Sequence, residues 1–161
     1  MVYAVSDLDE AAVRFRETFG LDSLEGGRHD RGGTANRIVP LGEDYLELAA
    51  AVDRDAAAKA GFGRAVMERA DAGGGWVTFA VATDDLDGVA DRLGLEVASG
   101  ARTRPDGEVL RWRSAGIDDA RRESWMPFFL AWTCDSPTST GRRPRGDSAT
   151  TSGRPGSRSS R

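Results

Sequence analysis

One short sequence pattern occurs twice in this chain. Tyr3–Asp9 returns as Phe79–Asp87, and the Gly20-Leu21 pair returns as Gly94-Leu95. One repeat of this spacing in 161 residues predicts two pseudo-symmetric halves rather than a solenoid of many short units. We therefore expect a ligand site between the two halves.

Each copy of the pattern predicts a strand followed by a capped helix. In the first copy, Ser6 is the expected helix N-cap, and Gly20 is the expected left-handed stop. Turn signals later in each copy predict further strands, while the glycine-rich residues 26–33 are expected to form a loop. The sequence thus predicts units at about 1–52 and 76–132, each with one helix and about four strands, joined by a helical linker at 53–75.

Composition restricts the environment and the partners. The net charge is −4, but six arginines lie after residue 132, so the preceding residues carry about −8, which argues against nucleic acid as a partner. Cys134 is the only cysteine, which favours a reducing cytoplasm. No apolar run approaches the ~20 residues needed to span a bilayer. We expect a cytoplasmic protein with no membrane partner.

Several motifs in the first unit, and one near the end of the second, resemble those of the vicinal oxygen chelate superfamily. They match in particular its glyoxalase-like domain proteins, a group related to bleomycin resistance proteins and dioxygenases. The residues that carry the resemblance are Tyr3–Asp9, Gly26–His29, Gly33–Asn36, Val39–Gly42, Tyr45–Leu48 and Trp125–Phe129. The resemblance implies an α+β fold in which two βαβββ units form a cupped mixed β-sheet over residues 1–132.

The resemblance also implies where a divalent metal would bind. In that superfamily the ligands come from the first and last strands of each unit. Here the first ligand would fall before Met1, Glu47 matches the carboxylate ligand, and Trp76 and Ala131 stand at the equivalent positions of the second unit. A divalent site needs several converging donors. We therefore expect no tight metal site, and the cofactor stays unknown.

The candidate catalytic residues are His29 and Glu47. His29 is the only histidine and is the leading candidate for a general acid or base, although most histidines in loops are merely solvated. Glu47 is equally well explained as an outward-facing carboxylate on a strand. The family pattern usually has a second histidine where Ala35 stands, so a mechanism with two histidines is weakened.

Five other residues are candidates for ligand binding. Three are polar, and two are aromatic residues that would form an apolar wall unless they serve only as core. They are Arg28, Thr34, Asn36, Trp112 and Phe128. Trp76 and Trp125 are further aromatic candidates for the same wall.

Three functional hypotheses follow. The first is a cup that binds a small molecule without metal; the second is a metal-dependent lyase or dioxygenase whose N-terminal ligand is missing from this sequence; the third is a damaged gene product. A small molecule is the expected partner in the first two, and the fold allows a homodimer. Fold alone decides none of these.

The two ends of the chain carry a separate expectation. Residues 133–161 contain no Val, Ile, Leu, Met or aromatic residue, so we expect a disordered low-complexity tail, with a basic nucleic-acid-binding tail as the less favoured alternative. The resemblance starts within a strand at Met1 and stops after Trp132. We therefore expect the reading frame to be wrong at both ends.

Overall fold

A computed structural model describes residues 1–29, 31–123 and 125–133 of the chain. The elements in chain order are β1 (Val2–Ala4), α1 (Leu8–Phe19), β2 (Leu24–His29), β3 (Thr34–Leu41), β4 (Asp44–Ala51), α2 (Arg54–Lys59), α3 (Gly61–Asp71), β5 (Gly75–Ala82), α4 (Leu86–Leu93), β6 (Val97–Thr103), β7 (Val109–Ala115), α5 (Ile117–Arg122) and β8 (Pro127–Trp132). The predicted tail at 133–161 lies, apart from Thr133, outside the described residues.

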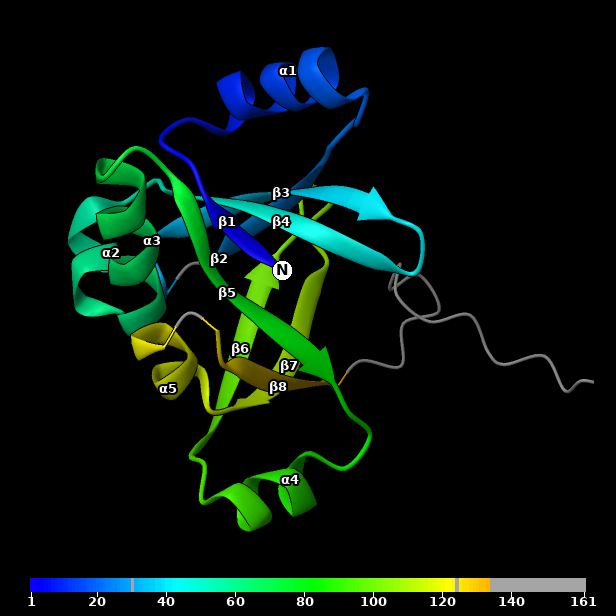
Figure 1. The fold of residues 1–161 in the computed structure, drawn as a ribbon, viewed down its shortest axis with the longest axis vertical. Coiled ribbons are helices and arrows are strands. Elements are labelled where there is room, and N and C mark those ends of the chain that lie inside the picture. The colour runs from blue at the N-terminus through cyan, green and yellow to red at the C-terminus, as the bar shows by residue number, and fades with distance from the viewer. Residues whose placement is uncertain (30, 124, 134–161) are drawn as a thin grey trace, which may run out of the picture.

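The strands form one mixed sheet made of two similar halves. The order β1-β4-β3-β2-β6-β7-β8-β5 closes on itself as a barrel. Within each half the first strand runs parallel to the last, as β1 does to β4 and β5 does to β8. α1 packs on β3 and β4 and α4 packs on β7 and β8, at opposite ends of the molecule (Figure 1). This arrangement confirms the predicted α+β fold with two βαβββ units.

Two contacts between strands join the halves. Along one seam β1 pairs antiparallel with β5. The other seam, between β2 and β6, has a single pair of residues in register, Arg28 and Thr103. The space enclosed by the sheet is therefore lined by both halves of the chain.

The helix boundaries differ slightly from those expected. Asp7, not Ser6, is the N-cap of α1, and its carboxylate accepts hydrogen bonds of 2.8 Å from the backbone N–H groups of Asp9 and Glu10. Asp85 takes the same role before α4. A carboxylate stabilises the positive end of a helix better than a hydroxyl does, which explains the shift of one residue. Gly20 and Gly94 end their helices in the left-handed conformation, as predicted.

Residues 24–29 form strand β2, although a loop was expected from residue 26 onward. Glycine is required at position 26 of this strand. A Cβ there would overlap the side-chain oxygen of Asn36, and a larger residue would displace it. Gly27 has φ +140°, at an irregular register step between β2 and β3, and a Cβ there would overlap the carbonyl of Thr103. The two glycines therefore allow β6 to approach β2 closely, and they do not mark a flexible loop.

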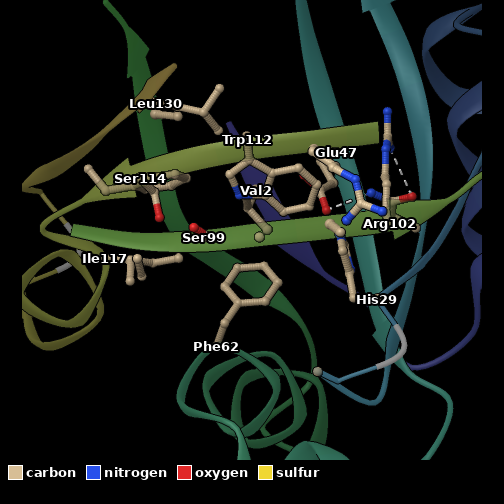
Figure 2. A pocket seen from close by; sticks show the side chains of 18 of the residues that line it. Val2, His29, Glu47, Phe62, Ser99, Arg102, Trp112, Ser114, Ile117 and Leu130 are labelled. Atoms are coloured by element: carbon tan, nitrogen blue, oxygen red, sulfur yellow. Dashed lines mark hydrogen bonds between the residues drawn. The ribbon is translucent and has the colours of Figure 1, made fainter. Parts of the chain in front are cut away.

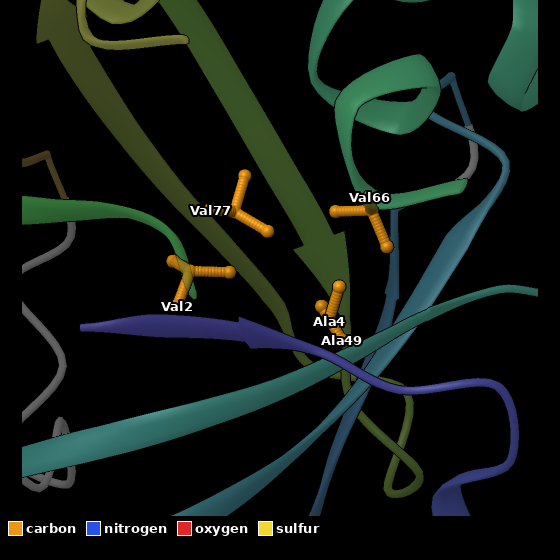
Figure 3. Packing of buried hydrophobic residues seen from close by; sticks show 5 residues of the cluster. All are labelled: Val2, Ala4, Ala49, Val66 and Val77. Atoms are coloured by element: carbon orange, nitrogen blue, oxygen red, sulfur yellow. The ribbon is translucent and has the colours of Figure 1, made fainter. Parts of the chain in front are cut away.

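Helix α3 of the linker packs over the seam between β1 and β5. Val66 of α3 is fully buried against Val2, Ala4, Ala49 and Val77, so the linker contributes a side chain to a core shared by both halves (Figure 3). α3 also contacts α5, which closes the same side of the sheet (Figure 1). Within the described residues, no helix combines the length and the apolar character required to cross a bilayer.

Candidate functional site

A cavity of about 580 Å³ lies inside the sheet, between the two halves. Every strand contributes lining residues, and α3 and α5 add Phe62 and Ile117. This volume is in the range of sites that bind small molecules. The cavity occupies the place where the repeat predicted a ligand site.

One end of the cavity holds a chain of hydrogen-bonded polar side chains. Arg102 on β6 donates from Nη1 to Oδ1 of Asn36 at 3.2 Å, and Asn36 donates from Nδ2 to Oε1 of Glu47 at 2.7 Å (Figure 2). Asn36 is fully buried on β3, while Glu47 and Arg102 are partly buried. Because arginine is only a donor, the amide oxygen of Asn36 must face Arg102 and its NH₂ group must face Glu47.

His29 lies beside this chain, at the end of β2. Its Nδ1 shares a hydrogen bond of 2.9 Å with the hydroxyl of Thr34, which is also fully buried. The imidazole meets Phe62 and Trp112 edge to face, with centroid distances of 6.1 and 5.8 Å. These contacts fix the orientation of the ring from three sides.

The remaining wall of the cavity is mainly apolar. The indole of Trp112 lies against Gly100, where a Cβ would overlap it, and meets Trp132 at a centroid distance of 5.7 Å. Phe128 is buried and also lines the cavity. Ile117 and Leu130 lie at the end opposite His29 and Arg102, with Trp112 between the two ends (Figure 2). The cavity thus has a polar chain at one end and is mainly aromatic and aliphatic along the rest, where Ser99 and Ser114 add two hydroxyls (Figure 2).

Tyr45 brings a phenol to the polar end. Burial, helped by the Glu47 carboxylate and opposed by Arg102, raises the pKa of Tyr45 to about 12. The phenol therefore stays protonated and can donate a hydrogen bond at any pH at which the protein would work.

This pKa predicts how stability depends on alkaline pH. The ordinary pKa is 10, so the folded protein holds the proton more firmly than the unfolded chain does. The contribution of this proton to the free energy of unfolding is complete below pH 10. It is lost as pH rises toward 12, by up to about 3 kcal/mol. Urea unfolding from pH 9 to 11.5 should show that the free energy of unfolding falls more steeply with pH for the wild type than for Tyr45→Phe. Equal slopes would contradict the prediction.

The structure brings most of the predicted site residues to the cavity, but not Arg28. His29, Asn36, Glu47, Trp112 and Phe128 line it. Thr34 lies behind His29 as its hydrogen-bond partner. The side chain of Arg28 is exposed and outside the lining, because neighbouring residues on a strand point to opposite faces and His29 points inward. Trp76 and Trp125 are also outside the lining, 53% and 71% exposed.

Three important lining residues were not identified from the sequence. They are Arg102, Tyr45 and Phe62. Tyr45 was within reach, because it precedes Glu47 by two residues and so shares its face of β4. Nothing in the sequence distinguishes Arg102 from the other arginines, and Phe62 lies in what was assigned only as a linker.

The cavity does not provide the donors that a divalent metal of the superfamily type needs. Glu47 is the only carboxylate in the described lining, and it is already bonded to Asn36. Of the two positions that the resemblance marks in the second half, neither Trp76 nor Ala131 is part of the lining. Across residues 1–29, 31–123 and 125–133, no three His, Cys, Asp or Glu side chains form a group able to hold a metal.

Comparison with known families confirms the resemblance. The sequence model of the glyoxalase-like domain family matches residues 1–152. The chain belongs to this family. The match continues past residue 132, where the sequence analysis ended the domain. No curated protein matches this glyoxalase-like chain significantly.

Solved structures share the fold of this glyoxalase-like chain at 19% identity. A hypothetical protein from Staphylococcus aureus has a TM-score of 0.63 over 83% of the chain, which spans only 57% of that protein. Methylmalonyl-CoA epimerase from Mycobacterium tuberculosis has a TM-score of 0.55, with 81% and 83% of the two chains covered. The Streptomyces coelicolor epimerase in complex with 2-nitronate-propionyl-CoA has a TM-score of 0.58, with 83% and 94% covered. At this identity the likeness shows the fold alone.

Proposed function

We propose that the protein binds a small, mainly apolar molecule in the cavity and orients its polar end at the Arg102–Asn36–Glu47 chain. The observation that carries this proposal is the chain of hydrogen-bonded side chains at one end of a cavity whose other walls are mainly aromatic and aliphatic, with the hydroxyls of Ser99 and Ser114 as exceptions (Figure 2). A few placed polar groups in an apolar pocket are typical of small-molecule sites.

The chemistry of the walls supports this proposal. Trp112, Phe62 and Phe128 offer aromatic surfaces to a ring of the ligand. At the polar end, Glu47 offers an acceptor, whereas Arg102 and the Tyr45 phenol offer donors. Binding of this kind uses groups that the chain has, whereas metal-assisted lyase or dioxygenase chemistry would need ligands beyond Glu47. The epimerases with the same fold act on methylmalonyl-CoA, also a small molecule.

Proton transfer is the second candidate function. It is favoured by one observation, that His29 and Glu47 line the same cavity. Either group would then exchange a proton with a bound carbon acid or hydroxyl. Uptake of deuterium from D₂O into a bound ligand, lost in His29→Gln or Glu47→Gln, would distinguish this activity from binding alone.

Blocking the cavity should abolish binding. Ala80 lines the cavity, and Ala82, two residues on along β5, does not, so Ala80→Trp and Ala82→Trp form a matched pair. Calorimetric titration with naphthalene-2-carboxamide, a neutral two-ring probe, should give a Kd raised at least about tenfold by Ala80→Trp. Ala82→Trp should leave the Kd unchanged. Equal effects of the two variants would place binding elsewhere.

A further inference from the structure

Arg102 is a cavity residue whose hydrogen-bonding capacity is largely unused by the protein. Its guanidinium has five N–H donors. Among the described residues, Asn36 Oδ1 is the one acceptor within hydrogen-bond distance, and the Arg102 Nε atom is buried without any partner. Because Nε is enclosed by the protein, a ligand can reach only the Nη N–H groups, and an acceptor placed there would use donors that the protein leaves unbonded.

The charge of Arg102 also lacks a carboxylate partner. In the part of the chain that the structure describes, no Asp or Glu oxygen lies within 4.0 Å of its guanidinium. Asn36 stands between Arg102 and Glu47 and holds the carboxylate by its amide. Glu47 is the only carboxylate in the described lining, and it is bonded to Asn36 rather than to Arg102. The cavity is therefore suited to an anion.

The guanidinium is held in place before any ligand arrives. The amide of Asn36 is fixed by Glu47 on one side and receives Arg102 on the other. Gly26 makes room for this contact, because a Cβ there would come within 2.8 Å of Arg102 Nη1. A positioned guanidinium binds a planar carboxylate by two parallel hydrogen bonds better than a flexible one does.

We infer that the ligand of the proposed site is an aromatic carboxylate, with its anionic group on Arg102 and its ring against Trp112. This inference rests on the proposed function and adds the charge of the ligand. The two contacts come from neighbouring strands: Trp112 pairs in register with Gly100 on β6, and Arg102 follows Gly100 by two residues on the same face (Figure 2). A carboxylate joined to a ring can therefore reach both.

The test compares two probes that differ in charge but not in shape. Wild type should bind naphthalene-2-carboxylate at least about tenfold more tightly than naphthalene-2-carboxamide at low salt. Arg102→Gln should remove this preference, and Arg102→Lys, which keeps the charge without the planar fork, should keep part of it. Arg104→Gln is the control, since Arg104 is outside the lining and pairs with Glu108 at 2.8 Å.

The outcomes separate this inference from the proposed function. Equal affinity of wild type for both probes, or a preference that survives in Arg102→Gln, would overturn the carboxylate while leaving a small-molecule site. Binding of neither probe would overturn both. Thermal unfolding of each variant verifies its fold, and if Arg102→Gln does not fold, an undiminished preference in Arg102→Lys would overturn the inference.

Discussion

Replacing Asn36 with leucine is expected to lower the free energy of unfolding by about 3 to 5 kcal/mol. Leucine is close to asparagine in volume but has no amide, so Glu47 would lose a donor and Arg102 its acceptor, both in partly buried positions. A charged group left without its buried partner costs more than an ordinary lost hydrogen bond. Urea unfolding of the variant measures the loss.

A triple variant is the control for this prediction. Asn36→Leu combined with Glu47→Leu and Arg102→Met replaces the whole polar chain with apolar side chains. Because it leaves no charge unpaired, most of the lost stability should return, although ligand binding should not. A single variant as stable as the wild type would show that the Arg102–Asn36–Glu47 chain does not stabilise the fold. A triple variant less stable than the single one would show that unpaired charge is not the cause of the loss.

Substituting Gly100 with alanine is expected to destabilise the protein by about 2 kcal/mol. In an open strand the same change would be neutral or favourable, because alanine loses less backbone freedom on folding. Here the added methyl would overlap the indole of Trp112, and Trp112 pairs in register with Gly100, so the ring must move into the cavity. Affinity for the two-ring probes should fall with it.

A double-mutant cycle tests the cause directly. In a Trp112→Ala background the indole is absent, so Gly100→Ala should cost nothing or stabilise slightly. The expected coupling free energy is about 2 kcal/mol. An equal cost of Gly100→Ala in both backgrounds would mean that strand pairing, not the indole, excludes a side chain at this position.

The repeat and the caps made the fold predictable from the sequence. A polar residue before the helix and a glycine stop appear twice, although the first cap is Asp7 rather than the expected Ser6, and the second pair is Asp85 and Gly94. These are local signals, which a sequence carries within a few residues. Strand β2 was missed because the glycines that suggested a loop are there for close packing against Asn36, Arg102 and Thr103, and such packing depends on distant residues.

The site was predictable in the half where the motifs are strong. His29, Asn36 and Glu47 were found because the family resemblance marks them. Arg102 was not, because it reaches the site only when β6 pairs with β2, a contact between residues far apart in the sequence. Arg28 and His29 were proposed together, and the alternation of side chains along a strand separates them.

The most direct test is a crystal structure of the protein with naphthalene-2-carboxylate. We expect the probe inside the cavity, with its rings against Trp112 and its carboxylate oxygens about 2.8 Å from the guanidinium nitrogens of Arg102. A probe bound on the outer surface of the sheet, with the cavity empty, would contradict the assignment of this cavity as the functional site.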